Sequence, residues 1–256
     1  MLRRALPVLL FVALLQAVAG RAAAGSPFSN WGALVVAGDW RGARGGPTEA
    51  FDNARRDVAS ELVRLGFSPD NIVQYSVNPD RYAREKLGKS DIRGIFEGLG
   101  RLAARTPEGC LVYFTSHGAP QGVVVDQSIL PPGVLSAILD QTCGARPTIA
   151  VISACYSGVF VPDLGASNRM VLTAARPDRT SFGCGESNRY PFFDECFLQS
   201  APSAKDFPAL ARKVQTCVAD RETLEKVSPP SEPQLFIGAQ LRPVLPLYAF
   251  PARSPP

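Results

Sequence analysis

Histidine is almost missing from this chain, and the net charge is small. His117 is the only histidine among the 256 residues, which excludes metal sites built from several histidines, such as the HExxH metallopeptidase site. The formal net charge is +4, and part of it comes from three arginines at the N-terminus, Arg3, Arg4 and Arg21. The remaining chain is close to neutral. It therefore gives no reason to expect a nucleic acid or an anionic membrane surface as a partner.

Apolar runs long enough to span a bilayer are also missing. The longest run, residues 5–19, is shorter than the roughly 20 residues that a spanning helix needs. It follows a basic start and is followed by small residues typical of signal peptidase sites. We therefore expect residues 1–25 to be a cleaved signal peptide, with no stable membrane insertion afterwards. Arginine outnumbers lysine by 22 to five, which favours a bacterial source and hence a periplasmic or secreted protein.

No two cysteines have the CxxC spacing, so neither a structural zinc site nor a thioredoxin-like dithiol is expected. In an oxidising compartment most cysteines would be paired. If one is a working thiol, the other five form at most two disulfides, and spacing alone does not choose the pairs. The six cysteines are Cys110, Cys143, Cys155, Cys184, Cys196 and Cys217.

Strand-like and helix-like segments alternate along the chain. Hydrophobic residues make up 46% of it, enough for a sizeable core in one domain. The alternation predicts an α/β fold with a mostly parallel sheet covered on both faces, and a site at the carboxyl ends of the strands. The Pro-rich end, residues 242–256, is expected to be an extended tail. We predict strands at 32–37, 71–77, 110–115, 123–125, 148–152, 170–172 and 235–237, and helices at 48–65, 90–102, 131–139, 190–198 and 207–218.

Two of the predicted strands run directly into reactive residues. His117 follows the strand at 110–115, and Cys155 follows the strand at 148–152. If these strands are parallel neighbours, both side chains emerge at one edge of the sheet. An imidazole there would accept the proton of the thiol and so activate it as a nucleophile. The N–H groups of Gly118 and Cys155 would form an oxyanion hole. Taken singly, each residue has a common alternative explanation, a hydrogen-bonded polar histidine and a core or disulfide cysteine.

The sequences around these two residues resemble the catalytic motifs of a known family. Tyr-Phe-Thr-Ser-His-Gly at 113–118 and Ile-Ser-Ala-Cys-Tyr-Ser-Gly at 152–158 are similar to the two motifs of the legumain family. These asparaginyl endopeptidases are relatives of the caspases and of the GPI-anchor transamidase subunit. Further segments resemble the family in the same order along the chain, namely 31–38, 66–73, 122–125, 173–177 and 181–184.

The resemblance implies a three-layer α/β/α sandwich, caspase-like, around a mostly parallel six-stranded sheet. It implies hydrolysis of peptide bonds through a thioester, with a peptide or protein substrate and neither a metal nor an organic cofactor. His117 would be the general base and acid, and Cys155 the nucleophile. Gly118 and Cys155 would supply the oxyanion N–H groups.

The chain departs from the family around the substrate pocket. The first loop, at 44–49, lacks the family's Asn and its Arg-His pair, and Ser153 replaces an acidic residue two positions before the nucleophile. Cleavage after Asn is therefore doubtful. Glu49 would favour a basic P1 side chain, unless it is only a carboxylate in the first turn of a helix. Asp194 and Glu195 lie near the family's other pocket carboxylate, with surface charges as the alternative.

We therefore expect an exported cysteine endopeptidase with a peptidase domain at residues 26–241. A transpeptidase or transamidase that uses the same acyl-enzyme is an alternative. A catalytically silent binding domain is another, favoured by the altered first loop and opposed by the retained His and Cys. Cys184 and Cys196 are expected to form a disulfide that stabilises the pocket wall.

Overall fold

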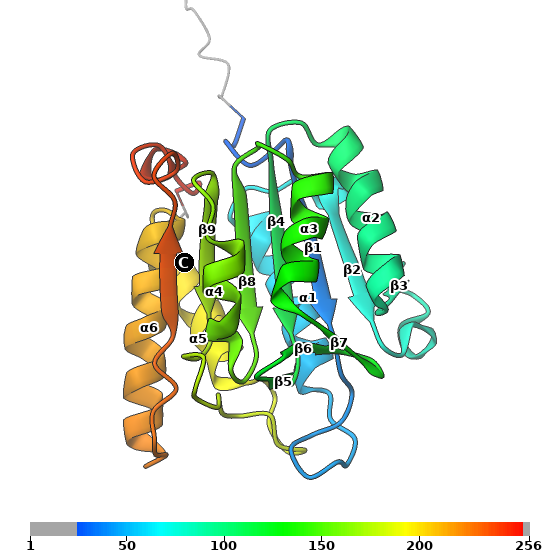
Figure 1. Cartoon of the computed structure of the whole chain (residues 1–256), viewed down its shortest axis with the longest axis vertical. Coiled ribbons are helices and arrows are strands. Elements are labelled where there is room, and N and C mark those ends of the chain that lie inside the picture. The colour runs from blue at the N-terminus through cyan, green and yellow to red at the C-terminus, as the bar shows by residue number, and fades with distance from the viewer. Residues whose placement is uncertain (1–24, 253–256) are drawn as a thin grey trace, which may run out of the picture.

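Seven strands form a central sheet in the computed structural model, which describes residues 25–252 (Figure 1). The expected signal peptide, residues 1–25, lies outside the described residues except for its last residue. In their order across the sheet the strands are β10 (Gln234–Ile237), β9 (Arg169–Thr173), β8 (Thr148–Ser153), β4 (Gly109–Thr115), β1 (Trp31–Ala37), β2 (Ile72–Ser76) and β3 (Gly88–Lys89).

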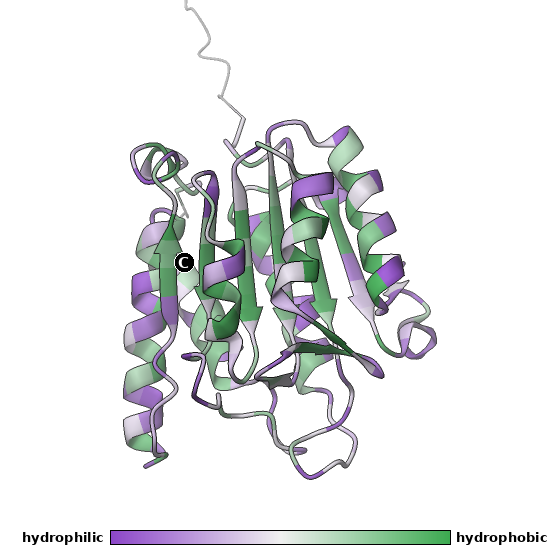
Figure 2. Ribbon diagram, in the orientation of Figure 1, coloured by the Kyte–Doolittle hydropathy of each residue, from purple (hydrophilic) through white to green (hydrophobic). Residues whose placement is uncertain are grey.

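Neighbouring strands of this sheet run parallel except at the β9–β10 edge. The central strands β1, β4, β8 and β9 are buried along their whole length. Burial on both faces explains why their sequences are mostly apolar rather than alternating, as the green strands of Figure 2 show. The predicted mostly parallel sheet is confirmed. The sheet has seven strands rather than the expected six, because the two-residue strand β3 extends one edge.

Helices cover both faces of the sheet and complete the predicted α/β/α sandwich. On one face lie α1 (Ala50–Arg64), α5 (Phe192–Ser200) and α6 (Phe207–Leu224), and on the other lie α2 (Ile92–Arg105), α3 (Pro132–Thr142) and α4 (Phe160–Leu164). Strand side chains alternate between the two cores. In β4, Tyr113 belongs to the α1 side, whereas Val112 and Phe114 belong to the α2 side.

Polar side chains accept hydrogen bonds from free N–H groups at the N-terminal ends of two helices. The Asp91 carboxylate accepts from the Gly94 N–H at 2.7 Å and begins α2, as predicted. Before α1, the Thr48 hydroxyl oxygen accepts from the Ala50 N–H at 3.2 Å. These bonds satisfy N–H groups that have no partner inside the helix.

A small antiparallel ribbon follows β4 at the carboxyl end of the sheet. It consists of β5 (Gly118–Ala119), β6 (Gly122–Val125) and β7 (Ser128–Leu130). The strand predicted at 123–125 is β6. The ribbon lies at the lower end of the central strands in Figure 1, beside the loops that connect strands to helices.

The disulfides differ from the expected pairing. Cys196 of α5 bonds to Cys217 of α6, with the Cα atoms 5.6 Å apart, and Cys110 bonds to Cys143. The expected Cys184–Cys196 bridge is therefore wrong, because Cys196 faces the neighbouring helix. Among the described residues, Cys155 and Cys184 are the free cysteines.

The C-terminal segment packs on the core as far as it is described. Leu245 is buried, and the Phe250 N–H donates to the Lys205 carbonyl at 2.9 Å. Within residues 25–252, no helix is both long enough and apolar enough to cross a membrane.

Candidate active site

The ends of β4 and β8 bring the two predicted reactive residues to one edge of the sheet. Thr115 and Ser153 are register partners in these adjacent parallel strands. The Ser116 N–H donates to the Ser153 carbonyl at 3.0 Å and extends the pairing beyond the strands. His117 and Cys155 each stand two residues after this register pair. They therefore leave neighbouring strands at the same level.

Gly118 brings the two motifs into direct contact. A Cβ atom added at this glycine would lie 2.1 Å from the Cys155 carbonyl oxygen and 3.0 Å from the Ala154 Cβ. No side chain fits at that distance, so the close approach of the two backbones requires glycine. The His117 loop and the Cys155 loop thus form one continuous surface.

A backbone carbonyl from the first loop holds the imidazole. His117 Nε2 lies 2.8 Å from the Arg41 carbonyl oxygen. Because a carbonyl only accepts hydrogen bonds, Nε2 carries the proton in this contact and Nδ1 is left as the basic nitrogen. The Phe51 ring of α1 packs edge-on against the imidazole, with the ring centroids 5.1 Å apart. The tautomer and the ring plane are both fixed.

Asp39 fixes the position of that carbonyl. Its carboxylate, 3% exposed, accepts from the N–H groups of Trp40 and Arg41 at 2.7 and 3.1 Å. It also forms an ion pair with the Arg41 guanidinium at 2.9 Å. Residues 38–49 contain no Asn, and it is a backbone group of this loop that contacts the imidazole. Sequence reasoning missed Arg41 because the interacting atom belongs to the backbone, which every residue has.

The Cys155 thiol is surrounded by atoms of Ser181. The Ser181 N–H donates to Sγ at 3.3 Å, and the Ser181 hydroxyl oxygen lies 3.6 Å from it. The thiol in turn donates to the Ser181 carbonyl oxygen, 3.5 Å away. The next residue, Tyr156, has a left-handed backbone with φ of 57°, and its N–H donates to the Arg179 carbonyl at 2.7 Å. This sharp turn directs the chain from β8 into the short helices that follow.

Two loops, residues 38–49 and 174–191, are joined to each other beside this edge. The Ala43 N–H donates to the Cys184 carbonyl at 2.9 Å. The Glu186 carboxylate accepts from the N–H groups of Arg44 and Gly46 at 3.0 and 3.3 Å. These bonds tie the His117-contacting loop to the Cys155-contacting loop.

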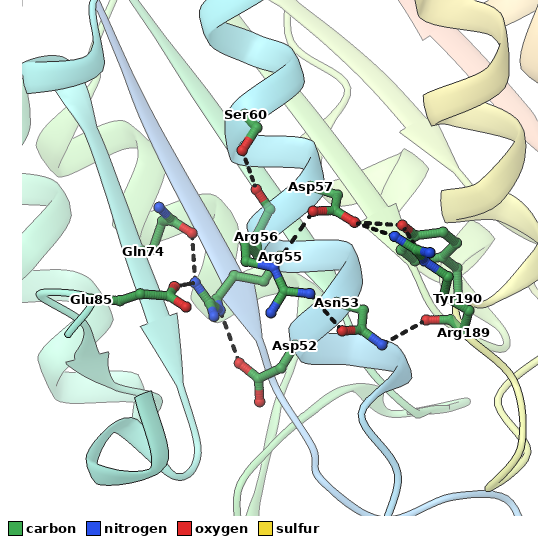
Figure 3. A network of polar contacts seen from close by, with 10 residues as sticks. All are labelled: Asp52, Asn53, Arg55, Arg56, Asp57, Ser60, Gln74, Glu85, Arg189 and Tyr190. Atoms are coloured by element: carbon green, nitrogen blue, oxygen red, sulfur yellow. Dashed lines mark hydrogen bonds and ion pairs between the residues drawn. The ribbon is translucent and has the colours of Figure 1, made fainter. Parts of the chain in front are cut away.

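Helix α1 anchors the second loop from the other side (Figure 3). The Asn53 amide donates to the Arg189 carbonyl at 3.2 Å, and Asp57 accepts from the Tyr190 hydroxyl. In the same figure Arg55, which is fully buried, binds residues from α1, β2 and the β2–β3 connection. Its partners are Asp52, Gln74 and Glu85.

Cys184 is the second free thiol near the site, and it stays protonated. Burial and, to a smaller extent, the charge of Cys155 together raise the pKa of the Cys184 thiol to about 11. A thiol with this pKa is a poor nucleophile at neutral pH.

Two of the four residues expected around the substrate pocket form ion pairs with arginines of the protein. Glu49 forms an ion pair with Arg81 at 2.6 Å, so its carboxylate is already neutralised. Glu195 forms an ion pair with Arg221 of α6 at 3.6 Å. Both carboxylates therefore have an arginine partner within the protein, and their expected roles at the substrate pocket stay predictions.

Asp194 and Ser153 do lie together, but inside the protein. Asp194 has no exposed surface and Ser153 is 2% exposed. The carboxylate is enclosed by the hydroxyl groups of Ser153, Thr115 and Tyr113, all within 2.8 Å. This enclosure corrects the expectation that Asp194 and Ser153 line an open pocket. Across residues 25–252, no cluster of three or more His, Cys, Asp or Glu side chains has the arrangement of a metal site.

Comparison with known proteins agrees with this architecture. The crystal structure of Caspase-1 from Spodoptera frugiperda matches with a TM-score of 0.59 and 13% sequence identity, over 83% of this chain and 88% of that chain. At this identity the match shows the fold, which is caspase-like. The search of curated proteins found no match. The family model of the Peptidase C13 family matches residues 63–220. With more than half of its length matched, the chain belongs to the Peptidase C13 family, the legumain family of cysteine peptidases.

Proposed function

We propose that this protein is a cysteine endopeptidase in which Cys155 is the nucleophile and His117 is the general base and acid. The observation that carries the proposal is the contact between the two motifs, where Gly118 lies directly against the Cys155 carbonyl at the ends of β4 and β8. The peptidase family to which the chain belongs supports the same reaction class.

The first step is proton transfer from the thiol. Nδ1 of His117 is the basic nitrogen, because Nε2 donates to the Arg41 carbonyl. It accepts the Sγ proton, and the thiolate attacks the carbonyl carbon of the scissile peptide bond. The Arg41 carbonyl then stabilises the imidazolium by accepting from Nε2.

The negative charge that develops on the substrate oxygen needs two donors. The His117 carbonyl accepts from the Val124 N–H at 2.9 Å, so these residues form a hydrogen-bonded pair of the ribbon. Hydrogen-bonded and open pairs alternate in an antiparallel ladder, so the next pair, Gly118–Val123, is open. The Gly118 N–H then points away from β6. The Cys155 N–H has no acceptor among the described residues. Both are free to bind the oxyanion.

The tetrahedral intermediate collapses when His117 donates its proton to the leaving amine, which gives a thioester on Cys155. Water then attacks the thioester, with His117 again as the base, and the thiol is regenerated. No metal or organic cofactor enters this sequence of steps.

We further propose that the peptidase domain, residues 26–241, acts outside the cytoplasm after removal of residues 1–25, with residues 242–256 as its C-terminal tail. The two disulfides are compatible with an extracellular location. The substrate is a peptide or protein.

The test is cleavage of a diverse peptide library, read by mass spectrometry, with protein of residues 26–256. The wild type is compared with Cys155→Ala and His117→Ala, and with Cys184→Ser as the matched control for the second free thiol. We expect cuts with the wild type and with Cys184→Ser, and none with the other two. Cuts that persist in Cys155→Ala would overturn the proposal. The residues before the cuts give the P1 preference.

A further inference from the structure

Asp194 is a buried carboxylate that the reaction steps above do not use. It lies in the first turn of α5 with no exposed surface. Its Oδ2 accepts from the Thr115 hydroxyl and the Ser153 hydroxyl, both at 2.8 Å. Its Oδ1 accepts from the Tyr113 hydroxyl at 2.6 Å. Among the described residues, no basic side chain forms an ion pair with it.

The two residues that share Oδ2 are register partners in the strands that carry the reactive residues. Thr115 pairs with Ser153 between β4 and β8. Thr115 stands two residues before His117, and Ser153 stands two residues before Cys155. Side chains two residues apart in a strand project to the same face. Oδ2 therefore connects β4 and β8 two residues before His117 and Cys155, on the face of the sheet that α1 and α5 cover.

This arrangement lowers the stability of the folded protein. Burial raises the pKa of Asp194 to about 6, while its three hydroxyl partners favour the charged form. A buried charge without a basic partner stabilises a protein less than a well-packed apolar group does. Costly groups of this kind concentrate at functional sites, where precise geometry outweighs stability.

We propose that Asp194 is a positioning residue, whose Oδ2 bridges Thr115 and Ser153 and thereby fixes the separation of His117 and Cys155. It does not touch the substrate. The inference rests on the proposed roles of those two residues. A bridge of this kind acts on the chemical step, because a small error in the placement of base and nucleophile slows proton transfer and attack.

The test compares Asp194→Ala with Asp194→Asn. Alanine removes the bridge, whereas the asparagine oxygen has the same place and accepts from both hydroxyls. For Asp194→Ala we expect kcat to fall about tenfold or more, with KM within about twofold of the wild type. For Asp194→Asn we expect kcat within about threefold of the wild type. Wild-type kcat in Asp194→Ala, or a change confined to KM, would overturn the proposal.

Two further variants keep the test decisive if Asp194→Ala does not fold. Thr115→Val and Ser153→Ala each remove one arm of the bridge and leave the carboxylate in place, and the double variant is expected to match the kcat loss of Asp194→Ala. An unchanged kcat in the double variant contradicts the bridge. The control is Asp206→Ala, which removes a 2% exposed carboxylate that caps α6 through the Ala209 N–H at 2.7 Å. We expect this control to lower Tm and to leave kcat and KM unchanged.

A second readout separates this inference from the peptidase proposal. The rate at which iodoacetamide alkylates Cys155 reports on its activation by His117 and requires no peptide cleavage. We expect that rate to fall about tenfold in Asp194→Ala and to recover in Asp194→Asn. This pattern in a protein that cleaves no peptide supports the bridge and contradicts the peptidase function. Active wild type with equal alkylation rates in all three proteins supports the peptidase function and contradicts the bridge.

Discussion

At the scale of single residues, the orientation of the His117 imidazole depends on a backbone carbonyl. The Arg41 carbonyl binds His117 Nε2 and so leaves Nδ1 as the basic nitrogen of the neutral imidazole. A substitution cannot remove a backbone carbonyl, but it can remove the contacts that hold the loop of residues 38–49 in place. Asp39 is the side chain that holds this loop, through two backbone N–H groups and one guanidinium.

Replacement of Asp39 by alanine is therefore expected to impair His117 as a base, although His117 itself is unchanged. We predict a decrease in kcat of about tenfold for Asp39→Ala, because the Arg41 carbonyl loses its fixed position. Steady-state kinetics on a peptide substrate measures this change. Asp70→Ala, at an exposed position, serves as the control and is expected to behave as the wild type. Equal kcat values for the two variants would argue against a role for the loop.

The two free thiols are expected to differ sharply in reactivity. With its pKa raised to about 11, Cys184 holds roughly one thousandth of its population as thiolate at pH 8. Iodoacetamide at pH 8 is expected to label Cys155 in the native protein and to leave Cys184 unlabelled, as read by peptide mapping. In urea both become labelled. Equal labelling of both thiols in the native protein is the contrary result.

The buried carboxylate of Asp194 gives the fold a particular dependence on pH. Its pKa is about 6 in the folded protein and lower in the unfolded chain, so the unfolded chain ionises first as the pH rises. The free energy of unfolding contributed by this group therefore decreases between about pH 4 and pH 7, by about 2 kcal/mol. Asp194→Asn does not titrate, so its stability relative to the wild type is expected to increase over that range. Urea unfolding at several pH values tests this, and parallel pH curves for the two proteins would contradict it.

At the scale of elements, the strand ends determine the site. The predicted strands before His117 and Cys155 are confirmed as β4 and β8, because continuous apolar runs are the signature of strands buried on both faces. The short strands β3, β5 and β7 and the five-residue helix α4 were missed. They are too short for a periodic pattern, and they form through pairing and packing with elements that are distant in the sequence.

Gly118 lies where the loop after β4 contacts the loop after β8. A Cβ at this position would lie 2.1 Å from the Cys155 carbonyl oxygen, so Gly118→Ala must separate the two loops. We predict a loss of kcat of about a hundredfold or more, because both proposed oxyanion donors belong to these loops. Gly100→Ala is the matched control. In α2 its added Cβ meets only a methyl group of Thr142 at 3.9 Å, and helix propensity predicts a gain in stability of up to about 1 kcal/mol. Activity measured beside thermal unfolding separates the two effects, and an active Gly118→Ala would refute the contact.

At the scale of the whole molecule, the layers bring distant segments to one edge of the sheet. The sequence was sufficient to predict a mostly parallel sheet covered on both faces, and it placed His117 and Cys155 directly after the ends of two strands. It was not sufficient for Asp194, which reaches Thr115 and Ser153 only because α5 packs on that face of the sheet. The same packing explains the wrong disulfide prediction, because α5 faces α6 and Cys196 therefore meets Cys217.

The proposed function requires that peptide cleavage proceeds through a thioester on Cys155. It is tested most directly by mixing the enzyme with a cleavable peptide, quenching in acid and mapping the acylated residue by mass spectrometry. We expect an acyl group on Cys155 in the wild type, none in Cys155→Ala, and much slower accumulation in His117→Ala. An acyl group on another residue, or cleavage that continues in Cys155→Ala, would contradict it.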